Sequence, residues 1–157
     1  MDTLTKFYEE YADSIYNYCY WRIRDKKEAE DLTAEAFLRF VRQNGLTKEF
    51  PKAYLYAICR NLLIDYFRAK KPAISLDVLL SSGFEPESKY DIEQQAELGL
   101  VFTEVESLPY DQREAIILRY QQDLDIKTIS QILGKSEAAV KALLSRGLES
   151  IRKKLNV

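Results

Sequence analysis

Residues 111–155 constrain the fold of this 157-residue chain more than any other stretch. Asp111 and Glu114 have the spacing of a capping box, which predicts the start of a helix. A second short helix is predicted from near Asp125, and Gly134 stands where a helix needs a left-handed stop. A longer amphipathic helix follows. Two short helices, a tight glycine turn and a longer third helix together predict a helix-turn-helix.

The predicted third helix has two contrasting faces, and Ser136 is its candidate N-cap. Its apolar residues recur close to a helical period and indicate a buried side: Val140, Leu143, Leu144, Leu148, Ile151 and Leu155. The other face is basic, because residues 135–154 hold six bases and only two acids. Small residues near the first turns and cations on the flanks suit entry into a DNA major groove. The alternative is a solvated end of a helical bundle, since this motif also serves packing alone.

Composition argues against an enzyme or a membrane protein. The chain has no histidine, which removes the usual general base and the usual zinc partner of cysteine. Cys19 and Cys59 lie in apolar helical patterns and are predicted to be buried, reduced thiols. No apolar run approaches the roughly 20 residues of a membrane span, and residues 1–20 do not resemble a signal peptide. We expect a cytoplasmic protein without catalysis, cofactor, metal or membrane insertion.

The fold is predicted to be all-α, with two small helical domains. No sustained strand alternation is present, and the five glycines and four prolines cluster at boundaries. We expect an N-terminal domain at 1–71, a linker at 72–90 and a C-terminal helix-turn-helix domain at 91–157, beginning with a helix at about 91–107. Residues 72–97 hold six acids and one base, a net charge of −5, although the whole chain carries only −2. Charge is therefore segregated along the chain.

Three helices are predicted in the N-terminal domain, at residues 3–23, 26–43 and 51–69. The residues predicted to be buried are Leu4, Phe7, Tyr8, Tyr11, Ile15, Cys19 and Ile23 in the first helix, Ala29, Leu32, Ala36, Phe37, Phe40 and Val41 in the second, and Leu55, Ile58, Cys59, Leu62 and Tyr66 in the third. The exposed start of the second helix is acidic. Its acids either complement the helix dipole or form a docking face for a basic partner.

The third of these helices carries a polar and aromatic face. Tyr54, Asn61, Asp65 and Arg68 lie on it, and the Tyr56 and Phe67 rings are expected to be exposed or half-exposed, beside the bases Arg60, Lys70 and Lys71. Rings that stack on bases and cations that follow the backbone are typical of single-stranded nucleic-acid binding. The alternative is tyrosines that snorkel at a surface, with structural hydrogen bonds from the polar residues. The preceding loop, residues 43–50, is expected to be short, polar and exposed.

Nearly the whole chain resembles the extracytoplasmic-function (ECF) sigma factors, the smallest bacterial sigma-70-type initiation factors. EAEDLTAEAFLRF is similar to the segment that docks on the largest RNA polymerase subunits. AYLYAICRNLLIDYFRAKKP resembles the segment that melts and recognises the −10 element. LPYDQREAIILRY and IKTISQILGKSEAAVKALLSRGLESIRKKL resemble the segment that recognises the −35 element. The resemblance implies binding to core RNA polymerase and promoter DNA, and an anti-sigma factor as a further partner.

The resemblance also implies roles for individual residues. The residues predicted to bind polymerase are Asp31, Leu32, Glu35 and Phe37. Those predicted to bind −10 DNA are Asn44, Lys48, Tyr54, Tyr56, Arg60, Asn61, Asp65 and Arg68, with loop 43–50 capturing a flipped base. Those predicted to bind −35 DNA are Lys135, Ser136, Glu137, Lys141, Ser145 and Arg146. The acidic linker is expected to thread into the polymerase along a path that nucleic acid would otherwise occupy.

The sequence departs from the family at several positions. Tyr54-Leu55 stands where Trp-Leu is common, and Ala142-Leu143 where a serine-arginine pair is common. Gly147 replaces a frequent alanine, and loop 43–50 lacks a Phe-x-Gly-x-Ser-like pattern. These changes affect the promoter sequence rather than the class. Three rival hypotheses are a helix-turn-helix regulator that binds duplex DNA alone, a pure interaction protein, and an enzyme that uses the Asp31 and Glu35 carboxylates.

Overall fold

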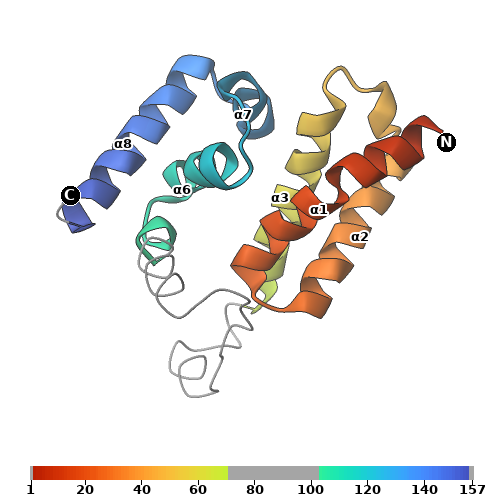
Figure 1. The fold of residues 1–157 in the computed structure, drawn as a ribbon, viewed down its shortest axis with the longest axis horizontal. Helices are drawn as coiled ribbons and strands as arrows, with labels where there is room; N and C mark the ends of the chain where they lie inside the picture. Colours follow the sequence, from red (N-terminus) through yellow and green to blue (C-terminus); the bar gives the residue numbers. More distant parts are fainter. Residues whose placement is uncertain (1, 71–102, 156–157) are drawn as a thin grey trace. The chain divides into compact units, whose positions relative to one another are not determined.

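The computed structural model describes residues 2–70 and 103–155, and these two parts contain helices and turns but no strand (Figure 1). The chain divides into two compact units, Met1–Pro86 and Glu87–Val157. The predicted all-α fold is confirmed. The predicted linker at 72–90 lies outside the described residues, as does the predicted helix at 91–107 up to residue 102; residues 103–106 are helical.

The first unit contains three long helices, α1 (Thr3–Ile23), α2 (Lys26–Arg42) and α3 (Pro51–Lys70), and a 3₁₀ turn, η1 (Gly45–Thr47). Local signals set their ends. The Asp2 carboxylate accepts a hydrogen bond from the Thr5 N–H (2.6 Å), and the Asp25 carboxylate accepts one from the Glu28 N–H (3.1 Å). Proline begins α3, where its missing N–H costs nothing. The predicted helix limits are therefore confirmed to within one residue.

The core of the first unit lies where α1 and α3 both pack on α2 and also contact each other. The largest fully buried side chains there are Tyr18, Tyr56, Phe40, Ile15, Leu55 and Leu63. Two predicted core residues are wrong, because Tyr8 is 49% exposed and Val41 is 47% exposed. Thr33 is buried although the sequence pattern did not indicate it, and its hydroxyl donates to the Ala29 carbonyl oxygen (2.7 Å).

The second unit contains α6 (Tyr110–Ile116), a π-helical turn η2 (Ile117–Gln121), α7 (Ile126–Leu133) and α8 (Glu137–Leu155). The predicted capping box is wrong. Pro109 occupies the N-cap of α6 without a side-chain cap, so Asp111 lies inside the first turn. The π turn is an addition that the sequence did not predict. There the Gln122 N–H donates to the Ile117 carbonyl oxygen five residues earlier (3.1 Å).

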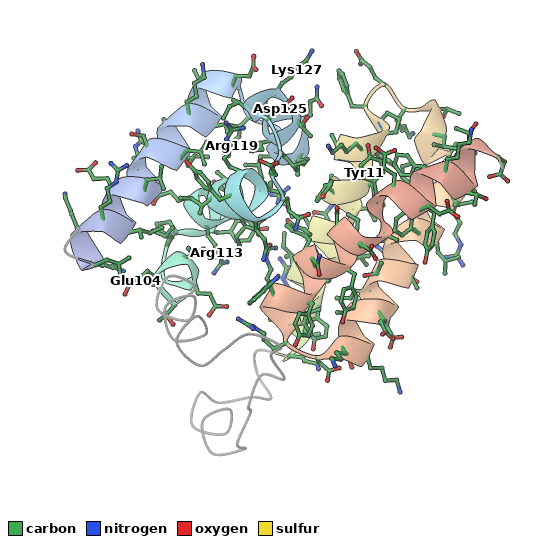
Figure 2. The ribbon with its side chains drawn as sticks, viewed as in Figure 1. Tyr11, Glu104, Arg113, Arg119, Asp125 and Lys127 are labelled. Carbon is green, nitrogen blue, oxygen red and sulfur yellow. The ribbon has the colours of Figure 1, made fainter. Side chains whose placement is uncertain are left out.

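Helix α8 holds the second unit together, since α6 and α7 both pack on it. Ile129 and Val140 are fully buried between these elements. The far end of α8 is joined to the segment before α6, because the Lys154 ammonium lies 3.5 Å from the Glu104 carboxylate and donates to the Ser107 hydroxyl (2.8 Å). Figure 2 shows Arg119 and Asp125 close to the junction of η2 and α7, where the Arg119 guanidinium donates to the Leu124 carbonyl oxygen (2.9 Å).

Candidate functional site

The turn between α7 and α8 has the geometry of the predicted helix-turn-helix. The Asp125 carboxylate caps α7 by accepting from the Thr128 N–H (2.8 Å). Gly134 ends α7 at a φ of 66°, in the left-handed region that glycine adopts without strain. The Ser136 hydroxyl then accepts from the Ala139 N–H (3.1 Å) and caps α8. Gly134 and Ser136 thus have the structural roles predicted for them, and α7 begins next to Asp125 as expected.

We define the α8 surface as the predicted −35 residues Lys135, Ser136, Glu137, Lys141, Ser145 and Arg146, all of which are exposed. Five of them lie on the first half of α8 or its cap. Lys135 differs, because its ammonium lies 3.5 Å from the Asp111 carboxylate and so links the turn to α6. Within residues 2–70 and 103–155, Lys141 and Arg146 have no ion-pair partner. Their charges are therefore available to an anionic ligand.

We define the α2 surface as the predicted polymerase-binding residues Asp31, Leu32, Glu35 and Phe37. The Asp31 and Glu35 carboxylates are one turn apart on α2 and share a face. Arg39 lies one turn further, and its guanidinium donates to the Glu35 carboxylate (3.1 Å). Phe37 is only 6% exposed, because its ring packs edge-on against the Tyr8 ring with centroids 4.8 Å apart. The Phe37 ring therefore supports this surface from beneath.

The loop between α2 and α3 is anchored to both helices. Asn44 adopts the left-handed region with a φ of 54°. A Cβ added to Gly45 would lie 2.2 Å from the Phe40 ring, so only glycine fits where the loop crosses α2. The Tyr54 hydroxyl donates to the side-chain oxygen of Gln43, and the Lys48 ammonium lies 5.2 Å from the Tyr54 ring centroid. These contacts hold a ring, an amide and a cation together at the start of α3.

We define the α3 surface as the predicted −10 residues Arg60, Asn61, Asp65 and Arg68 on α3. Asn61, Asp65 and Arg68 are exposed and share one helical face, with Arg60 half-buried beside it. The expectation of an exposed or half-exposed Tyr56 ring is wrong. Tyr56 is 1% exposed and packs edge-on against Tyr18, with centroids 5.6 Å apart, and this burial raises its pKa. A base cannot reach its face without opening the core.

Several exposed side chains near these surfaces were not among the individual residues predicted to bind, although two of them lie in the loop 43–50 that was predicted to be exposed. Phe50 is 42% exposed at the end of the loop, one residue before α3, and Gln43 contacts Tyr54 at the start of the loop. Leu38 is 49% exposed on α2, one residue beyond the predicted set. An apolar residue that interrupts a polar loop, as Phe50 does, is the signal that could have drawn attention to it. None of the described helices is long and apolar enough to span a membrane.

The comparisons with known proteins cover both units. Residues 7–72 match the family profile of Sigma-70 region 2, and residues 99–151 match that of Sigma-70, region 4. The ECF RNA polymerase sigma factor SigM of Bacillus subtilis is 31% identical over 96% of this chain and 93% of its own length. The ECF RNA polymerase sigma factor BldN of Streptomyces coelicolor is 29% identical over 98% of this chain, which spans 61% of that relative's length.

A solved structure agrees at the level of the fold. The sigma factor RpoE of Bartonella quintana, crystallised with the anti-sigma factor NepR, matches with a TM-score of 0.72 at 20% identity. The match covers 100% of this chain and 99% of that one. With region 2 in the first unit and region 4, which contains the helix-turn-helix, in the second, the chain belongs to the ECF RNA polymerase sigma factors of the sigma-70 family.

Proposed function

We propose that this sigma factor binds core RNA polymerase in the bacterial cytoplasm and directs it to specific promoters. The observation that carries the proposal is the presence, in one chain, of a region 2 unit and a region 4 unit. Exposed residues among those predicted from the family resemblance lie on both units. Region 2 melts the −10 element, and region 4 binds the −35 element as duplex. The chain acts through binding alone and is not an enzyme.

The α2 surface is the proposed polymerase contact. Its two carboxylates are one turn apart on a rigid helix, and both are at least partly exposed. Carboxylates in this arrangement favour a partner surface rich in arginine or lysine, with which they form charge-assisted hydrogen bonds. Leu32 is half-buried beside them and Leu38 is 49% exposed, so apolar contacts accompany the charged ones. The ion pair between Glu35 and Arg39 must loosen or be shared when the partner binds.

The loop and the α3 surface are the proposed −10 contacts. Extracting a base from a duplex costs a few kcal/mol, and an aromatic ring that stacks on that base returns about 1–3 kcal/mol. Tyr54 and Phe50 offer rings, Gln43 offers an amide for a base edge, and Lys48 offers a cation for the backbone. Because Tyr56 is buried, its proposed part is to hold α3 in place and not to touch DNA.

The α8 surface is the proposed −35 contact. Arginine and lysine contact guanine edges in the major groove, and glutamate accepts from cytosine. Lys141 and Arg146 therefore suit base edges or phosphates, while the capped first turn of α8 carries Glu137. An anti-sigma factor is a further proposed partner, by analogy with the Bartonella RpoE complex. It would act by covering one or more of these three surfaces.

Run-off transcription tests the proposal. Purified bacterial core polymerase is supplied with a pool of promoter fragments, with and without this protein. Discrete transcripts that appear only with the protein are the expected result, and aligning their upstream sequences defines the −35 and −10 elements. Absence of new transcripts, together with tight sequence-specific duplex binding by the protein alone, would instead indicate a stand-alone helix-turn-helix regulator. Absence of both activities would leave a pure interaction protein.

A further inference from the structure

Two cysteines from different helices meet in the core of the first unit. The Cys19 sulfur on α1 lies 3.2 Å from the Cys59 sulfur on α3. Both residues are 0% exposed, and both are free thiols. They are 40 positions apart in the sequence, so only the packing of α1 on α3 brings them together. Neither residue is part of the α2, α3 or α8 surface.

The geometry is close to that of a disulfide. A disulfide has a sulfur–sulfur distance of about 2.05 Å, so the two sulfurs need to approach by only about 1.2 Å. The hydrogen bond from Cys59 lowers the pKa of the Cys19 thiol, and the positive charge of Arg22 acts in the same direction. Burial opposes this shift. A lowered pKa favours the thiolate form of Cys19, and the thiolate is the nucleophile in thiol oxidation.

We propose that Cys19 and Cys59 form a reversible dithiol–disulfide site whose oxidant is a hydroperoxide. The Cys19 thiolate attacks one peroxide oxygen, the O–O bond breaks, and the leaving hydroxide takes up a proton to become water. The resulting sulfenic acid on Cys19 is attacked by the Cys59 sulfur, which forms the S–S bond and releases a second water. Two thiols lose two electrons in total, and one hydrogen peroxide is reduced to two waters.

The disulfide would connect α1 to the middle of α3. Cys59 directly precedes Arg60 and Asn61, so the bond would fix the helix that carries the α3 surface. It would also close a loop that includes all of α2, and closing so long a loop restricts the unfolded chain strongly. The site does not rest on the proposed function, because its evidence is the distance between the two sulfurs, their burial and the lowered pKa of Cys19.

Burial sets the rate of this chemistry. Because both sulfurs are covered, a peroxide reaches them only when α1 and α3 separate locally. Oxidation should therefore be slow and should accelerate under conditions that loosen the first unit without unfolding it. Once formed, the disulfide should resist brief exposure to weak thiols for the same reason.

The test uses the full chain in native buffer. The protein is treated with excess hydrogen peroxide, then denatured and alkylated, and the intact mass is measured. The expected product is a monomer that has lost two hydrogens, takes up no alkyl group and regains both alkylation sites after dithiothreitol. Its melting temperature should rise by at least about 10 °C, because the cross-linked loop is long.

Two variants serve as controls. Cys19→Ala and Cys59→Ala each leave one thiol and should show no intramolecular product and no rise in melting temperature. The wild-type result decides the question even if a variant folds poorly. Three outcomes would overturn the proposal: thiols that remain fully alkylatable, products that carry added oxygen or link two chains, or a disulfide that lowers the melting temperature.

Discussion

Gly147 of α8 lies against Ile116 of α6 so closely that a Cβ added to the glycine would be 2.9 Å from the Ile116 Cδ1 atom. Both residues are buried, Ile116 with 5% of its surface exposed. A glycine inside a helix costs up to about 1 kcal/mol relative to alanine. In this chain the missing side chain of Gly147 lets α8 approach α6 closely. Helix α6 thereby packs against the longer helix of the helix-turn-helix.

Gly147→Ala should therefore give no net stabilisation, despite the better helix propensity of alanine. The gain of up to about 1 kcal/mol is offset by repacking around Ile116, since overfilling a core costs about 1–3 kcal/mol. The companion variant Ile116→Val removes the Cδ1 atom. Because the Ile116 Cγ1 atom, 3.1 Å from the added Cβ, has a counterpart in valine, Gly147→Ala should be less unfavourable in that background than in the wild type. Urea unfolding of the wild type, the two single variants and the double variant gives the coupling free energy between the two positions. Additive changes in unfolding free energy would contradict a steric conflict between the added Cβ and Ile116.

Gly134→Ala should destabilise the second unit by about 1–2 kcal/mol. The cause is backbone strain alone, because Gly134 has a φ of 66° and nothing lies within 4 Å of an added Cβ. Asp123→Gly is the reciprocal variant, since Asp123 is a non-glycine residue with a φ of 54°. It should be neutral or stabilising. The measurement is the melting temperature of each variant. An equal fall in melting temperature for both variants would contradict backbone strain as the cause.

Asp31→Lys combined with Glu35→Lys should abolish binding to core polymerase while the fold is kept. The double change reverses the charge of the α2 surface and also sets a second cation one turn before Arg39, a repulsion worth only about 0.2–0.5 kcal/mol on an exposed helix. Glu9→Lys with Asp13→Lys is the matched control, because these are exposed acids at the same spacing on α1. Co-purification with polymerase, alongside circular dichroism, is the measurement. Equal binding by wild type and the α2 variant would refute this docking site.

Lys141→Ala and Arg146→Ala should each weaken −35 recognition. A lost base-edge contact costs about 1–3 kcal/mol and relaxes specificity at one position. A lost phosphate contact weakens binding to all sequences equally and makes the salt dependence shallower. Lys153→Ala is the control, since Lys153 is exposed near the end of α8 and its ammonium pairs with the Glu149 carboxylate (3.3 Å). Titration of polymerase holoenzyme onto promoter variants at several salt concentrations distinguishes the two mechanisms.

Burial in the three-helix unit could be predicted only in part. A single apolar stripe per helix correctly indicated Ile15, Phe40 and Leu55. The same rule failed for Tyr56, because α3 contacts both α1 and α2 and therefore buries more than one stripe. It failed in the opposite sense for Val41, which lies in the last turn of α2 and is 47% exposed. Periodicity describes one helix, whereas burial depends on how many neighbours that helix has.

The sequence by itself determined the three long helices of the first unit, their limits and the turn of the helix-turn-helix. Those features depend on contacts within a few residues, such as the Asp125 cap, the left-handed Gly134 and the first-turn Pro51. Together with the family resemblance, it also indicated the three candidate surfaces. Only the tertiary structure decided what lies beneath them: the burial of Tyr56, the Gly147–Ile116 contact and the meeting of Cys19 with Cys59. Each of these joins residues far apart in the chain, so its energy depends on packing between helices, which no local pattern encodes.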